Sequence, residues 1–73
     1  MMAPMKKYIT IDASREMIDA IGGLTAVGLI FGIAPSSVWA WHHRTGMPVY
    51  RLLALKNTQY KRLPSVKTAL KEL

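Results

Sequence analysis

Apolar residues recur at helical spacing along most of the chain, and glycine and proline residues divide this pattern into short segments. The segments predict five helices, at about residues 14–21, 24–31, 35–44, 48–57 and 65–73. Thr10 or Asp12 can cap the first helix, and Ser65 can cap the last. Because a chain of 73 residues can build only one small core, we expect a single all-α domain spanning residues 1–73.

The chain between the second and third predicted helices has the residues of a tight turn. Gly32 follows "LTAVGLIF" at the position where helices commonly end in the left-handed conformation. Ile33 and Ala34 form the turn, and Pro35 occupies the first position of the next helix, where its missing N–H group costs nothing. Two helices joined by a short Gly-containing turn predict a helix-turn-helix motif at about residues 24–44.

The third predicted helix has two different faces. Val38 and Trp41 share an apolar side, which suits a core. The opposite side carries a hydroxyl, an indole, a methyl group and an imidazole, from Ser36, Trp39, Ala40 and His43. That side has no carboxylate, which phosphate would repel, so it is a candidate surface for a polyanion.

The stretch from Ala20 to His43 holds 24 residues without Lys, Arg, Asp or Glu, which raises the alternative of a membrane span near residues 20–43. A span needs about 20 uninterrupted, mostly apolar residues. Here the apolar run ends at Ala34 and is followed by Pro35. Gly28 and Gly32 have the four-residue spacing found where membrane helices dimerise, but this spacing alone is a weak signal. The segregated faces of the third helix favour the DNA-binding motif over a small membrane protein.

Charge is distributed unevenly along the chain. The formal net charge is +6, and no acidic residue occurs between Ala20 and Lys71. Seven cations lie in that interval: Arg44, Arg51, Lys56, Lys61, Arg62, Lys67 and Lys71. A long segment with cations and no anion favours a polyanionic partner, and nucleic acid in particular.

The segment "GGLTAVGLIFGIAPSSVWAWHHRTGMPVYRLLAL" resembles the helix-turn-helix of Cro-type repressors of lambdoid phages and prophages, and that of the related YdaS-like prophage regulators. The shared features are "GG-x-T-A", the turn Gly32 with an apolar residue after it, and "G-x-P" at Gly46 to Pro48. The resemblance implies about five helices and a homodimer that binds operator DNA and represses transcription in the bacterial cytoplasm. A prophage regulator or antitoxin of the YdaS-like type is the alternative within DNA binding.

The resemblance also implies roles for individual residues. The base-reading residues would be Pro35, Ser36, Trp39, Ala40 and His43, on a helix lying in the major groove. The phosphate contacts would come from Thr25, Arg44, Arg51 and Lys56. The core of the motif would comprise Val27, Phe31, Ile33, Val38 and Trp41. No Gln, Asn, Lys or Arg stands on the reading face, so bidentate base contacts are not expected there.

Leu29 and Ile30 depart from the family, which usually places charged or small residues at these outward positions. Two aliphatic residues there predict a cover, either the C-terminal segment 57–73 or a second subunit. That segment is expected to pack on its own domain or to form the dimer. Its linker, "NTQYKRLP", could also form a short strand, although Pro64 weighs against this.

No catalytic constellation is visible, so an enzyme, a cofactor and a small-molecule ligand are not expected. The chain has no cysteine. His42 and His43 are adjacent and therefore point about 100° apart on a helix, which is unsuited to a shared metal. We expect a structural role for His42. The N-terminal "MMAPMKKYITID" lacks the apolar region of a signal peptide.

Overall fold

Five α-helices and one 3-10 turn make up the part of the chain that the computed structural model describes, residues 7–73. The helices are α1 (Ile11–Ile21), α2 (Leu24–Phe31), α3 (Pro35–His43), α4 (Val49–Leu55) and α5 (Pro64–Lys71), and the 3-10 turn η1 is Gln59–Arg62. The described residues contain no strand, only an isolated antiparallel bridge between Tyr8 and Pro48. The prediction of a small all-α domain is confirmed, and the linker forms a 3-10 turn.

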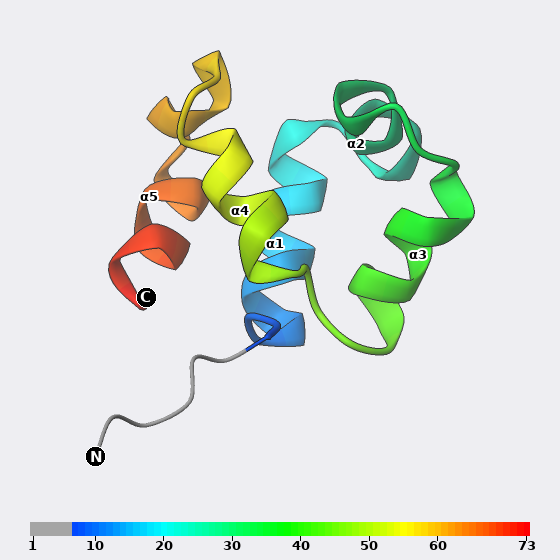
Figure 1. Ribbon diagram of the computed structural model, residues 1–73, viewed down its shortest axis with the longest axis horizontal. Helices are drawn as coiled ribbons and strands as arrows, with labels where there is room; N and C mark the ends of the chain where they lie inside the picture. The colour runs from blue at the N-terminus through cyan, green and yellow to red at the C-terminus, as the bar shows by residue number, and fades with distance from the viewer. Residues whose placement is uncertain (1–6) are drawn as a thin grey trace.

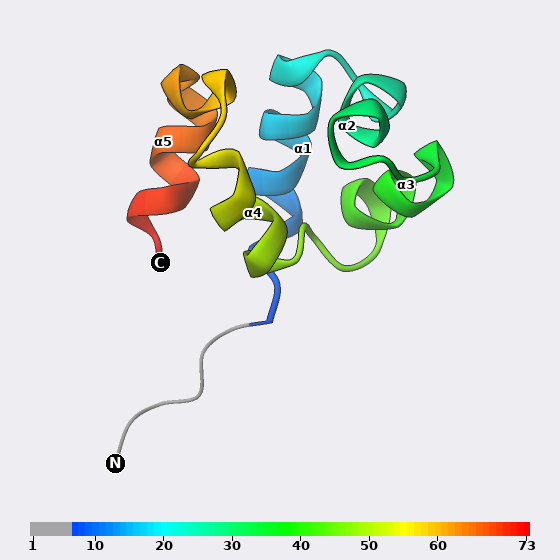
Figure 2. The same cartoon turned by 45° about the horizontal axis from the view of Figure 1, so that its top comes forward.

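Helix α1 lies in the middle of the molecule. Helices α2 and α3 pack on one side of it and α5 packs on the other, as two views show (Figures 1 and 2). The axes of α2 and α3 differ in direction by 119°. Helix α4 runs from the α3 side toward α5, which it contacts together with η1. The arrangement leaves α3 and α5 at opposite ends.

The helix ends show which local signals operate. The Thr10 hydroxyl accepts a hydrogen bond from the Ala13 N–H group at 3.2 Å, so Thr10 caps α1, which begins three residues earlier than predicted. Pro35 stands at the start of α3, as expected. The predicted Ser65 cap is wrong, because Pro64 begins α5 and places Ser65 inside the helix. The Ser65 hydroxyl is buried there without a hydrogen-bond partner.

Two glycines shape the connection from α2 to α3. Gly32 ends α2 in the left-handed conformation, with φ of 68°, as predicted. A Cβ atom on Gly28 would lie 2.7 Å from the Ile33 carbonyl oxygen, so only glycine lets the turn pack this closely on α2. The four-residue spacing of these glycines is therefore explained by the turn.

The core joins all five helices. Its fully buried side chains include Met17, Ile18, Val27, Val38, Met47, Leu52, Leu55 and Val66. Trp41 is 8% exposed and packs edge-on against Phe31, with ring centres 5.9 Å apart. Phe31 and Ile33 were expected in the core of the motif, but both are only partly buried at its margin.

The Ser14 hydroxyl joins α1 to the connection between α3 and α4. It accepts a hydrogen bond from the buried Met47 N–H group at 2.7 Å and donates to the Thr10 carbonyl at 2.8 Å. Beside it, the Ile9 N–H group donates to the Met47 carbonyl and the Val49 N–H group donates to the Lys7 carbonyl. These bonds fix the exit of α3 against the start of α1.

Of the two covers predicted for Leu29, the C-terminal segment is wrong, and a second subunit stays a prediction. Helix α5 packs its apolar stripe, with Val66 and Ala69 buried, against α1, α4 and η1. Leu29 lies on α2 and is 79% exposed. Ile30 instead is partly buried against the core. The C-terminal segment thus packs on its own domain, and its apolar stripe is used there.

No single helix among residues 7–73 is long and apolar enough to cross a membrane. The pair α2 and α3 passes such a test only when joined across their 119° bend. The expectation about the N-terminal segment concerns residues that lie partly outside the described ones.

Replacing Trp41 by alanine tests the faces of α3. Because the indole fills the core beside Phe31, Trp41→Ala should lower the free energy of unfolding by about 3–5 kcal/mol. Such a loss is comparable to the whole stability of a domain this small. Circular dichroism should therefore show a largely unfolded variant at room temperature, and a stably folded one would contradict the assignment.

Replacing Ser14 by alanine tests the bond to Met47. The Met47 N–H group would be left buried and unpartnered, which should cost about 1–3 kcal/mol in urea unfolding. Ser65→Ala is the matched control, because it removes a buried hydroxyl that has no partner and should leave stability nearly unchanged or higher. If the two variants change the free energy of unfolding equally, the hydrogen bond to Ser14 does not stabilise the fold.

Candidate functional site

The outer face of α3, defined here as Pro35, Ser36, Trp39, Ala40 and His43, points away from the core. All are exposed except Ala40, which is partly exposed. Val38 and Trp41, on the opposite side of the same helix, are buried. The packing of that apolar side on α1 and α2 therefore brings the five predicted reading residues together on one accessible surface.

Trp39 and His43 form a single stacked unit on this face. Their ring centres are 4.5 Å apart and their planes differ by 30°, as expected for residues one turn apart. Trp39 nevertheless remains 44% exposed. The stack limits the rotamers of both side chains, so the face presents a preformed flat surface bordered by an imidazole edge.

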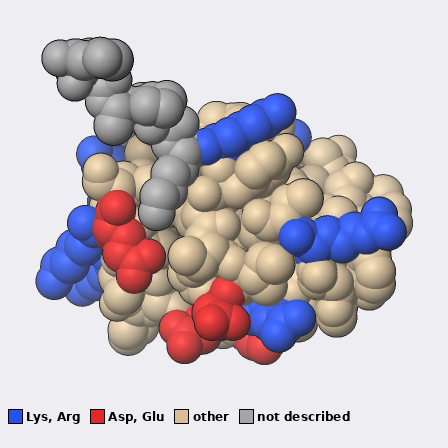
Figure 3. All heavy atoms as spheres, turned by 90° about the horizontal axis from the view of Figure 1, so that it is seen from below, with Lys and Arg blue, Asp and Glu red and all other residues tan. Residues whose placement is uncertain are grey.

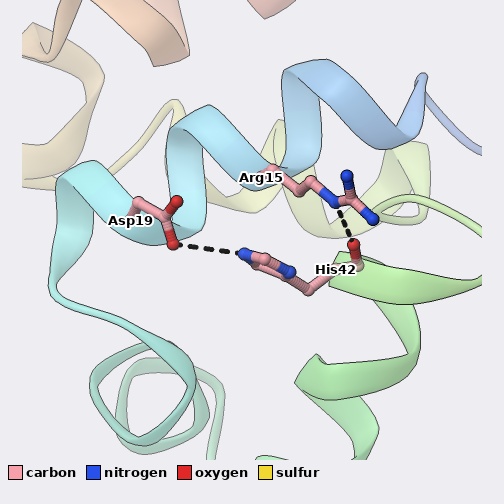
Figure 4. A network of polar contacts seen from close by, with 3 residues as sticks. All are labelled: Arg15, Asp19 and His42. Carbon is pink, nitrogen blue, oxygen red and sulfur yellow. Dashed lines mark hydrogen bonds and ion pairs between the residues drawn. The ribbon is translucent and has the colours of Figure 1, made fainter.

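His42 attaches the end of α3 to α1 (Figure 4). Its ring Nε2 lies 3.2 Å from the Asp19 carboxylate, and its backbone carbonyl accepts a hydrogen bond of 2.7 Å from Arg15 Nε. Because a carboxylate only accepts, Nε2 is the donor here. This geometry agrees with the structural role expected for His42. Arg15 and Asp19 were not anticipated, although their spacing of four residues places them on one side of a helix.

A groove of about 420 Å³ runs between α3 and α4 beside the outer face. Ser37 and Ala40 line it from α3, and Tyr50 and Arg51 line it from α4. The Arg51 guanidinium carbon lies 5.2 Å from the centre of the Phe31 ring and 5.1 Å from that of Tyr50. Its Nε atom is buried without a partner. The two rings thus hold a cation at the edge of α3.

The predicted phosphate contacts separate into two groups. Thr25 is exposed in the first turn of α2, where free backbone N–H groups favour an anion. Arg44 caps the end of α3, and Arg51 lines the adjoining groove. Lys56 instead follows the C-terminal end of α4, the helix that packs on η1 and α5 (Figure 1). The structure does not place Lys56 with the other residues.

Sequence reasoning missed Ser37 and Tyr50 as part of this site. Both are exposed and line the groove, but periodicity alone does not reveal which neighbouring helix an exposed residue faces. Among residues 7–73, no three His, Asp or Glu side chains are grouped so as to hold a metal ion.

Comparisons of the chain with protein-family models, with curated proteins and with solved structures gave no match. The resemblance to Cro-type and YdaS-like proteins therefore stays a prediction from the sequence motif, and the geometry of α2, α3 and the groove carries the functional argument.

Proposed function

We propose that α2 and α3 form a helix-turn-helix and that the outer face of α3 enters the major groove of duplex DNA. The observation that carries the proposal is this face, which is accessible and free of carboxylates, while the opposite side of α3 is packed in the core. An α-helix with its side chains is about 10–12 Å across, which suits a major groove about 12 Å wide.

Cations at the edges of α3 supply the electrostatic part of binding. Arg44 is exposed at the end of the helix, and Arg51 is held between two aromatic rings next to it. Thr25 lies in the first turn of α2. We propose that these three residues contact phosphates, which positions α3 without reading sequence.

Base reading on this face would differ from bidentate recognition. The Ser36 hydroxyl and the His43 ring can each exchange a hydrogen bond with a base edge. Ala40 and the exposed side of Trp39 can contact thymine methyl groups. Because the face has no Gln, Asn, Lys or Arg, part of the discrimination would come from DNA shape and deformability.

The wider proposal is a transcriptional repressor of the Cro or YdaS-like type that acts as a homodimer in the cytoplasm of a bacterial host. It acts through binding alone, without a catalytic step, a metal or a cofactor. Leu29 supports self-association, since this aliphatic side chain is 79% exposed and the C-terminal helix packs elsewhere. A twofold dimer would present two copies of α3 to a pseudo-palindromic site.

Two variants separate base reading from phosphate contact. A duplex selected by the protein from a randomised pool serves as the specific site, and an unselected duplex serves as the reference. Trp39→Ala should weaken binding to the selected duplex by about 1–3 kcal/mol and affect the unselected duplex much less. Arg51→Gln should weaken both by similar factors and reduce the slope of log affinity against log salt by about one unit.

Thermal melting provides the control for both variants, because Trp39 and Arg51 lie outside the fully buried core and the fold should survive. If Trp39→Ala leaves discrimination unchanged, the assignment of the reading face is wrong. If the affinity for DNA does not change with salt concentration, the proposal that these cations contact phosphates is wrong.

A further inference from the structure

A second group of cations lies at the end of the molecule that α5 occupies. The C-terminal basic cluster, defined here by five exposed side chains, comes from the end of α4, from η1 and from α5: Lys56, Lys61, Arg62, Lys67 and Lys71. Within residues 7–73, no ion pair joins any of them to a carboxylate. The cluster holds more cations than the α3 side, so the charge of the chain is not concentrated around the proposed reading helix.

Two cations of the cluster lie on the outward side of α5, at the end of the molecule opposite α3 (Figure 1). Lys67 and Lys71 are one turn apart on α5, on the side opposite Val66 and Ala69, which are buried. Helix α1 packs against both α3 and α5 and lies between them (Figures 1 and 2). On the face drawn in Figure 3, Lys and Arg side chains are spread along the molecule, and acidic side chains lie beside those at one end of the long axis.

A duplex held by α3 cannot also reach the cluster. DNA is stiff, with a persistence length of about 150 base pairs, so a bound segment remains nearly straight across a domain of this size. The whole thickness of the domain, including α1, separates the two surfaces. Any polyanion that the cluster binds must therefore be a different molecule or segment from the duplex on α3.

The surroundings of the cluster favour the backbone of a duplex over other polyanions. The side of α5 that faces away from the domain is polar, with Lys67, Thr68 and Lys71 exposed. A helix that lies on a membrane would instead need an apolar side free to enter the lipid. Tyr60, the aromatic residue of η1, packs against the core and offers no free platform for unpaired bases.

We propose that the C-terminal basic cluster binds the phosphates of a second duplex DNA segment, so that one chain holds two segments at opposite ends. This inference rests on the proposed function of α3. We assign these cations to phosphates, which carry no sequence information, so the second contact is electrostatic and independent of sequence. Its affinity falls steeply with salt.

A capture experiment with the full chain tests this bridging. Beads carry the selected duplex, the protein is added until that duplex is occupied, and a labelled unselected duplex is then supplied. The wild-type chain should retain the labelled duplex at low salt. Lys67→Gln with Lys71→Gln should reduce retention by about tenfold, while affinity for the selected duplex in solution changes less than about twofold.

The double variant Arg44→Gln with Arg51→Gln is the matched control, because it removes the same charge from the α3 side. It should weaken binding to the selected duplex itself. If the chain with Lys67→Gln and Lys71→Gln retains as much labelled duplex as the wild type, the inference is wrong. Bridging would then come from the two α3 helices of a dimer. Melting temperatures should match the wild type, because both lysines are exposed.

Two further outcomes separate this inference from the proposed function. If the wild-type chain binds the selected duplex but retains no second one, the cluster assignment fails and the α3 proposal stands. If it binds no duplex, both fail. A third outcome would assign the cluster to a membrane surface. In it, the wild-type chain retains no labelled duplex but binds phosphatidylserine-containing vesicles, and Lys67→Gln with Lys71→Gln abolishes the vesicle binding. This outcome would overturn the DNA assignment.

Discussion

The hydrogen bond from the Met47 N–H group to the Ser14 hydroxyl is the contact on which the placement of α3 depends. Ser14 is the only fully buried polar side chain among the described residues, and it joins α1 to the segment that leaves α3. The backbone bonds between Ile9 and Met47 and between Lys7 and Val49 close the same junction. At the other end of α3, Gly28 lets the turn pack on α2. With both ends held, the outer face of α3 is presented in one orientation.

Local chemistry explains why much of the fold was predictable. Gly32 and Pro35 specify the end of one helix and the start of the next through their own backbone preferences. Val38 and Trp41 reveal the buried side of α3 by spacing alone, and the exposed side follows from it. Each of these features depends only on residues within one or two helical turns, so it can be predicted from the local sequence.

Tertiary contacts explain the rest. Ser14 reads as an ordinary helix residue, and only its distance to Met47, 33 positions along the chain, gives it a role. Ser65 looks like a cap, but Pro64 has better chemistry for the first helical position. Arg51 was recognised as a cation, yet its placement between Phe31 and Tyr50 needs two helices to meet. The family resemblance groups Lys56 with the phosphate contacts, but Lys56 ends α4, which packs on η1 and α5.

The proposed function makes α3 the surface that meets specific DNA, and an NMR titration addresses that claim most directly. A selected duplex would be added to the isotopically labelled full chain, and backbone amide shifts would be followed residue by residue. The account predicts that the largest changes map to residues 35–44 and to the first turn of α2, where Thr25 lies. Changes confined to residues 56–71, or an absence of changes at saturating duplex, would contradict it.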